Sequence, residues 1–136
     1  MSNHKLNWAD IWVLRSIKMC TDSGKFDLSE VIAIADGINH AILTAEEFNN
    51  AVYRLKNNEL LAQNGRSLEL TELAIKIFEK HKNKSVHKQG KEIEKELGAT
   101  EYGPGYDPNL LEVPEEFISK GRFNNAVGEY QRKYGF

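Results

Sequence analysis

The chain of 136 residues is poor in the features that define several classes of protein. It has one cysteine, Cys20, so no internal disulfide can form, which agrees with a reducing cytoplasm. No apolar run is long enough to cross a bilayer. The first residues lack the charged leader, the apolar region and the cleavage site of an exported protein. We therefore expect a cytoplasmic protein without a membrane span.

A strong excess of charge of one sign is also missing. The net charge of −2 and the pI of about 6.1 argue against a protein that coats nucleic acid nonspecifically. The charge is uneven along the chain, because residues 1–91 hold 13 Lys and Arg against 11 Asp and Glu, whereas residues 92–136 hold 5 against 9. Only the first part is therefore suited to face phosphate.

Arrangements that carry chemistry are not found. The four histidines and Cys20 show no zinc-ligand spacing. The stretches KQGK and YGPGYD lack the pattern and the strand-loop-helix setting of a phosphate cradle. No serine or cysteine stands in the sequence context of a nucleophile elbow or a catalytic triad. We expect no metal site, no cofactor and no enzymatic activity.

The stretch from Thr44 to Thr71 is the most informative part of the chain. It opens with Thr44-x-x-Glu47, a capping box in which two side chains satisfy free N–H groups of the first turn of a helix. Apolar residues at helical spacing follow and predict a buried face, namely Phe48, Ala51, Val52 and Leu55. After this helix, Asn64-Gly65 predicts a two-residue hairpin turn, and Ser67 to Leu70 alternate as a returning strand.

Two helices are predicted before this stretch and one directly after it. Asn7 caps a helix over Ala9 to Cys20, Asp27 caps a second helix that stops at Gly37, and Thr71 caps the helix after the hairpin. The first helix is apolar on two sides, and its second apolar side consists of Trp8, Trp12 and Met19. Such a side is typical either of intramolecular core or of a subunit contact, and both alternatives remain open.

Three helices, a hairpin and a fourth helix in this order resemble the winged helix-turn-helix superfamily of many bacterial transcription regulators. The resemblance covers about Trp8 to Lys82 and includes LELTELA, which is similar to the junction that closes the wing. It implies an α+β, mainly α fold with a winged helix-turn-helix core. We predict a winged-helix domain over residues 1–84 and a C-terminal extension, a linker plus one or two helices, over residues 85–136.

The extension ends in an aromatic stripe that needs a surface to cover. Its apolar members at helical spacing are Phe123, Val127, Tyr130 and Tyr134. We expect this stripe to pack on the side of the first helix that carries Trp8, Trp12 and Met19, within one chain or between two chains of a homodimer.

The polar face of the third predicted helix and the wing supply the functional hypothesis. Asparagine pairs bidentately with adenine and arginine with guanine or phosphate, so the candidate DNA-binding residues are Asn49, Asn50, Tyr53, Arg54, Asn57 and Arg66. The expected function is a DNA-binding transcriptional regulator. The alternative is a winged-helix module that binds a protein, because Glu46 and Glu47 at the start of the helix would repel phosphate. A plain solvated helix face remains the structural alternative.

Overall fold

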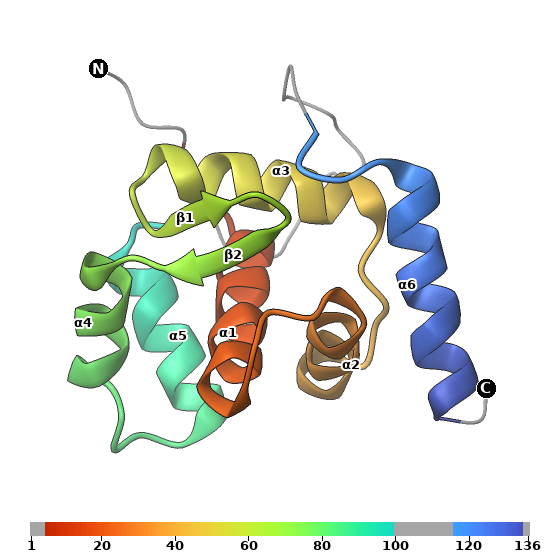
Figure 1. Ribbon diagram of the computed structural model, residues 1–136. Coiled ribbons are helices and arrows are strands. Elements are labelled where there is room, and N and C mark those ends of the chain that lie inside the picture. The colour runs from red at the N-terminus through yellow and green to blue at the C-terminus, as the bar shows by residue number, and fades with distance from the viewer. Residues whose placement is uncertain (1–4, 100–115, 135–136) are drawn as a thin grey trace.

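The computed structural model describes residues 5–99 and 116–134, and within them the fold is α+β and mainly helical. Six helices and one two-stranded antiparallel sheet are present in these residues (Figure 1). Their bounds are α1 Trp8–Ser23, α2 Leu28–Asn39, α3 Ala45–Asn57, β1 Leu61–Asn64, β2 Ser67–Leu70, α4 Glu72–Lys80, α5 Val86–Glu96 and α6 Lys120–Lys133. The mainly helical class is confirmed, and the order from α1 to α4 is compatible with a winged-helix-like layout.

The local signals in the sequence start the helices where they were predicted. Asn7 and Asp10 form a reciprocal capping box at α1, and Thr44 and Glu47 form another at α3. Thr71 accepts a hydrogen bond from the Ala74 amide at the start of α4. The predicted end of α2 at Gly37 is two residues too early, since the helix runs to Asn39 and ends on a left-handed residue at position 40.

The predicted hairpin is present, with its turn shifted by one residue. Asn64 pairs with Ser67, so the two central residues of the turn are Gly65 and Arg66. Gly65 has a φ of 62°, and Arg66 is not among the described residues with positive φ. This pattern fits a type II′ turn, in which glycine occupies the first central position. The shift places Arg66 at the tip of the hairpin, where it is exposed.

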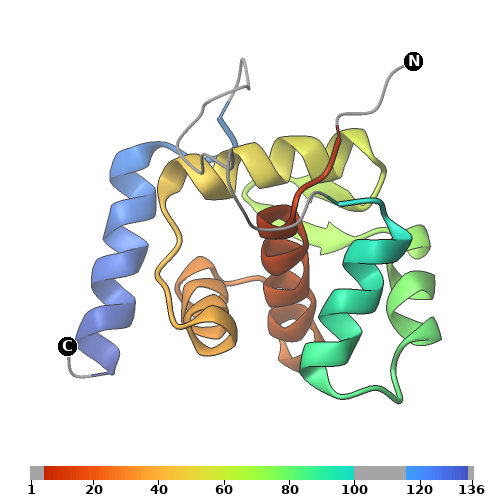
Figure 2. The ribbon, with the colours of Figure 1, turned by 180° about the vertical axis from the view of Figure 1, so that it is seen from behind.

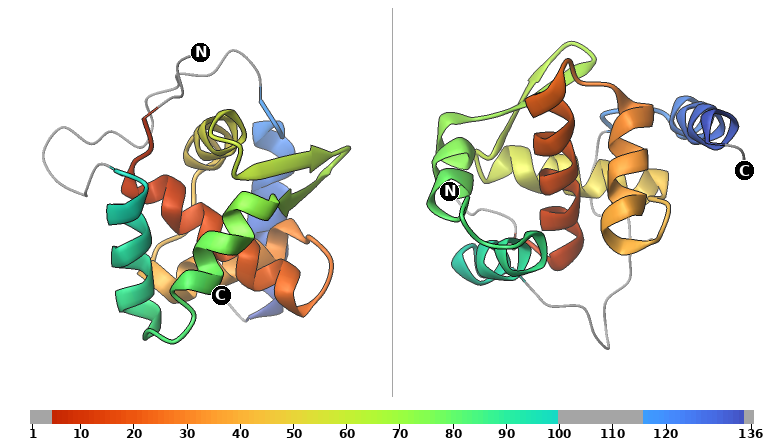
Figure 3. Two further views of the ribbon diagram at one scale, coloured as in Figure 1. Left: turned by 90° about the vertical axis from the view of Figure 1, so that its left-hand side faces the viewer. Right: turned by 90° about the horizontal axis from the view of Figure 1, so that it is seen from below.

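Four helices lie in a row, and α3 crosses one end of the row. From behind and from below, the order is α5, α1, α2 and α6 (Figures 2 and 3). The core is continuous through this arrangement and includes Phe48 and Leu55 of α3, Ile93 of α5 and Phe123 of α6. Both helices of the extension thus share one core with the first four helices, while the division after residue 84 remains a prediction. None of the described helices is long and apolar enough to span a membrane.

The expected docking site of the last helix within the chain is wrong, and the alternative between two chains stays a prediction. Helix α6 packs on α2 and α3 instead of the tryptophan side of α1. Phe123 is fully buried and its ring centroid lies 5.5 Å from that of Phe48. The Tyr130 hydroxyl donates to the Asp36 carboxylate on α2. Val127 is half-buried beside the core, and Tyr134 is exposed.

Candidate binding groove

Three of the six predicted DNA-contact residues do not face solvent. Asn49, Asn50 and Arg54 on α3 are 2%, 1% and 7% exposed. The prediction that they form a free outer face is therefore wrong. The physical reason is that polar side chains can be buried when hydrogen bonds or opposite charges replace water, which periodicity alone does not reveal.

Arg54 forms a buried ion pair that ties α3 to α1. Its Nε lies 2.8 Å from Oδ2 of Asp10, and its Nη2 lies 3.0 Å from Oδ1. Asp10 is fully buried and also accepts a hydrogen bond from the Asn7 amide. Burial raises the pKa of Asp10 above its ordinary value, and the Arg54 guanidinium acts against this rise. The pair is structural and leaves Arg54 unavailable to another molecule.

Asn49 holds the segment that precedes α6. Its side-chain Nδ2 donates to the Ile118 carbonyl at 2.9 Å, and its Oδ1 accepts from the Ile118 amide at 3.0 Å. Next to it, Phe117 lies with its ring centroid 6.0 Å from that of Phe48, and Lys120 lies 3.8 Å from Glu46. The first half of α3 is thus covered by the chain itself.

The remaining predicted DNA contacts are only partly accessible. Tyr53 is half-buried, whereas Asn57 and Arg66 are exposed. The side-chain amide of Asn57 donates to the carbonyl of Tyr53 one turn earlier, so one of its donors is already engaged within α3. The six candidates are therefore divided between the core and the surface and do not form one site.

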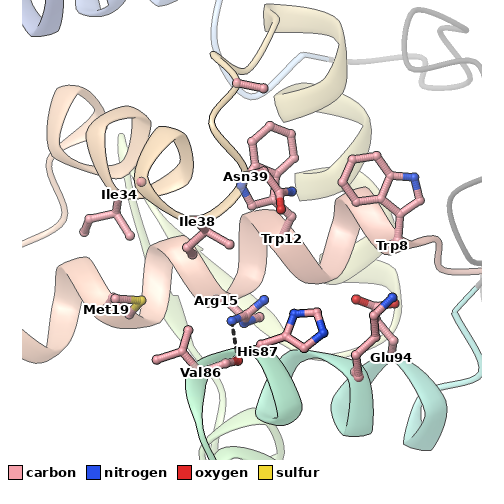
Figure 4. Close-up of a pocket in the computed structure, with 13 residues that line it drawn as sticks. Trp8, Trp12, Arg15, Met19, Ile34, Ile38, Asn39, Val86, His87 and Glu94 are labelled. Carbon is pink, nitrogen blue, oxygen red and sulfur yellow. Dashed lines mark hydrogen bonds between the residues drawn. The ribbon is translucent and has the colours of Figure 1, made fainter.

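A hollow lies elsewhere, between α1, α2 and α5. It has a volume of about 870 Å³, within the range of roughly 300–1,000 Å³ that is usual for ligand pockets. We call it the tryptophan groove. Its lining residues are Trp8, Trp12, Arg15 and Met19 of α1, Ile34, Gly37, Ile38, Asn39 and Ala41 from α2 and the residues after it, and Val86, His87, Lys91 and Glu94 of α5 (Figure 4).

Two stacked tryptophans form one end of this groove. The ring centroids of Trp8 and Trp12 are 5.7 Å apart and their planes differ by 14°. Trp12 is 3% exposed, and its indole Nε1 donates to the Ala35 carbonyl at 2.8 Å, which fastens α1 to α2. Trp8 is half-buried. The sequence had linked these residues with the last helix, whereas the structure surrounds them with α2 and α5.

Arg15 lies in the floor of the groove and is 8% exposed. Its Nη2 donates to the Val86 carbonyl at 2.7 Å, near the start of α5. Burial lowers the pKa of Arg15 from its ordinary value, and the negative charge of Glu94 partly offsets this. A guanidinium carries five N–H donors, and the bond to Val86 is its only hydrogen bond within the described residues. The residue therefore brings a positive charge to the floor of the groove while its guanidinium packs against α5.

Gly90 explains how a guanidinium fits against α5. A Cβ atom at position 90 would lie 2.3 Å from Nη1 of Arg15 and 2.7 Å from its Cζ. A glycine inside a helix costs about 0.5–1 kcal/mol relative to alanine. The sequence showed this glycine only as an interruption of a lysine-rich stretch. The sequence could not show that Gly90 lies opposite Arg15, because the two residues are far apart along the chain.

The groove presents apolar and charged side chains together. Met19 and Val86 remain 44% and 58% exposed, so apolar surface is open at the end away from the tryptophans. His87 and Lys91 on the α5 wall are exposed, and Glu94 lies near Trp8 (Figure 4). Within residues 5–99 and 116–134, no three His, Cys, Asp or Glu side chains gather in a way that could hold a metal ion.

Comparison with protein-family models, with curated proteins and with solved structures finds no match for this chain.

Proposed function

We propose that the chain is a protein-recognition module with a winged-helix-like core, and that the tryptophan groove binds the partner. The observation that carries this proposal is an apolar groove of about 870 Å³ with two tryptophans, a methionine and an arginine along its floor. Aromatic residues, methionine and arginine are the types that are enriched at protein interfaces and among their energetic hot spots.

The state of α3 supports this ranking of functions. A helix that reads DNA needs a free outer face, and here Asn49 and Arg54 are engaged within the chain. Two glutamates also lie in the first turn of α3. DNA binding remains the second candidate, because Asn57 at the end of α3 and Arg66 at the hairpin tip are exposed. Lys56, next to Asn57, is half-buried. In that case the chain would act as a transcriptional regulator that uses the end of α3 and the wing.

Selection from a random peptide library displayed on phage tests the leading proposal. The full chain is the bait, and the matched variants are Met19→Glu in the groove and Leu73→Glu on α4. The two parent residues are 44% and 49% exposed, so the variants differ mainly in location. Peptides enriched on the parent should lose binding to Met19→Glu and keep binding to Leu73→Glu. Equal binding to all three proteins would refute the groove as the site.

Binding to mixed genomic duplex tests the second candidate. Contacts with several phosphates make affinity fall steeply as salt rises. Salt-dependent binding that Arg66→Ala weakens and Met19→Glu leaves unchanged would place DNA recognition first. No binding at low salt would remove this candidate.

A further inference from the structure

One face of α1 forms the floor of the tryptophan groove along much of its length. Trp8, Trp12, Arg15 and Met19 follow one another at steps of four, three and four residues, which places them on one side of a helix. From Trp8 to Met19 this face is roughly 16 Å long at about 1.5 Å per residue. The groove is therefore long enough for about three turns of a second helix.

The walls of the groove are themselves helices. Helices α2 and α5 flank α1 on either side and both contact it (Figures 2 and 4). Helices pack at interaxial distances of about 8–10 Å, with side chains of one placed between side chains of the other. A helix laid along α1 between these walls would cover its exposed apolar atoms, as amphipathic helices do in hydrophobic grooves.

The floor is apolar at both ends and cationic between them. Trp8 and Trp12 form one end, and Met19 forms the other beside Ile34 and Val86 (Figure 4). Arg15 lies between the two ends and brings its positive charge to the floor there. A carboxylate is the side-chain group whose charge complements a guanidinium at such a position.

The α5 wall of the groove also carries charged side chains. His87 and Lys91 line the groove together with Arg15, while Glu94 lies toward Trp8 (Figure 4). Among the described lining residues, Lys91 and Arg15 carry positive charge and Glu94 carries negative charge. The middle of the groove therefore favours an acidic side chain, and the tryptophan end favours an apolar one.

We infer that the partner presents an amphipathic helix with two bulky apolar side chains two turns apart and one acidic side chain midway between them. The apolar side chains bind at the tryptophans and at Met19, and the carboxylate binds Arg15. This inference rests on the proposed function and names the chemistry of the partner segment.

Helical peptides of about 15 residues, long enough to form a marginally stable helix, provide the probe. Three peptides share two leucines two turns apart and differ only in the residue between them, which is Glu, Gln or Lys. Both tryptophans of the chain line the groove, so intrinsic fluorescence reports its occupancy. A hydrogen-bonded ion pair should make the Glu peptide bind about tenfold more tightly than the Gln peptide, and the Lys peptide should bind most weakly.

Variants of the protein connect this preference with the groove. Arg15→Gln should abolish the advantage of the Glu peptide, and Lys91→Glu on the exposed wall should reduce it even if the first variant does not fold. Lys76→Glu, an exposed control on α4, should leave the advantage unchanged.

Several results would overturn the inference. Equal affinity for all three peptides, or no affinity for any, would do so, and enrichment of other library peptides on the groove would still uphold the proposed function. Light scattering that shows a dimer for the parent and a monomer for Met19→Glu would assign the groove to a second copy of the chain. Failure of the library selection as well would remove the proposed function itself.

Discussion

Replacement of Arg54 by alanine separates the observed role of this residue from the role that its sequence position predicts. Asp10 is fully buried, and Arg54 holds it through contacts of 2.8 and 3.0 Å. Arg54→Ala would leave this carboxylate buried without its partner, which typically costs about 3–5 kcal/mol. The total stability of a domain is only about 5–15 kcal/mol. The variant should therefore unfold at a markedly lower urea concentration, as followed by circular dichroism.

Two comparisons make this experiment decisive. Arg66→Ala removes an exposed arginine and should change stability by less than about 0.5 kcal/mol. Asp10→Asn keeps an oxygen for the Asn7 amide but removes the charge, so the double variant with Arg54→Ala should be less destabilised than the sum of the two single changes. If Arg54→Ala behaves like Arg66→Ala, the buried pair does not exist and Arg54 again becomes a candidate for surface contact.

The same variant has a characteristic dependence on pH. Burial raises the pKa of Asp10 in the folded state above its ordinary value of 3.8, and Arg54 acts against this rise. Without Arg54 the folded-state pKa should be higher still, so the neutral carboxyl is favoured in the folded protein. The stability deficit of Arg54→Ala should be full above that pKa and shrink as pH falls through it toward the lower folded-state pKa of Asp10 in the parent. A deficit that grows on acidification would contradict this explanation.

Three further predictions follow from single contacts. Gly90→Ala should cost about 1–2 kcal/mol in urea unfolding, because it displaces a charged hydrogen bond, and should instead stabilise by about 0.5–1 kcal/mol when Arg15 is already alanine; an equal effect in both backgrounds would disprove the contact. Asn49→Ala should cost about 1–3 kcal/mol by the same measurement, since two backbone groups lose their partner, and a neutral result would show that the tail is not held there. Tyr130 should titrate with a pKa of about 12 in ultraviolet absorbance because it donates to Asp36, and return toward 10 in Asp36→Ala. Its contribution to stability is present below pH 10 and is lost as pH rises through about 12. Because the chain has five tyrosines, the bond would be refuted by an absorbance change near pH 10 that is as large in the parent as in Asp36→Ala.

The elements of the fold were predictable because their signals are local. A cap such as Thr44 with Glu47 acts over three residues, and the apolar positions of α3 repeat within two turns. The hairpin was predictable for the same reason, although the one-residue shift of its turn depended on which residues paired across the strands. Helix α5 was hard to predict, since Gly90 lowers its intrinsic helix propensity. The reason for a glycine at this position is the approach of Arg15 from α1, which the local sequence does not show.

The candidate site was not predictable in the same way. The polar residues of α3 were predicted to be exposed because asparagine and arginine usually are. The partner of Arg54 is Asp10, 44 residues earlier, and the partner of Asn49 is Ile118, 69 residues later. The sequence contained one sign of the groove, the second apolar side of the first helix. The charged wall came from α5, in the C-terminal extension that was predicted as a linker plus one or two helices.

The sequence alone determined where α1 to α4 and the hairpin begin and which apolar residues of α3 face the core, because those choices depend on neighbours within a few positions. The tertiary structure decided which polar face is used internally and which apolar face stays open. That decision depends on which helix occupies each flank of α1 and α3. Helix α6 and the segment before it cover α3, while α2 and α5 stand on either side of the tryptophans and leave the groove between them open.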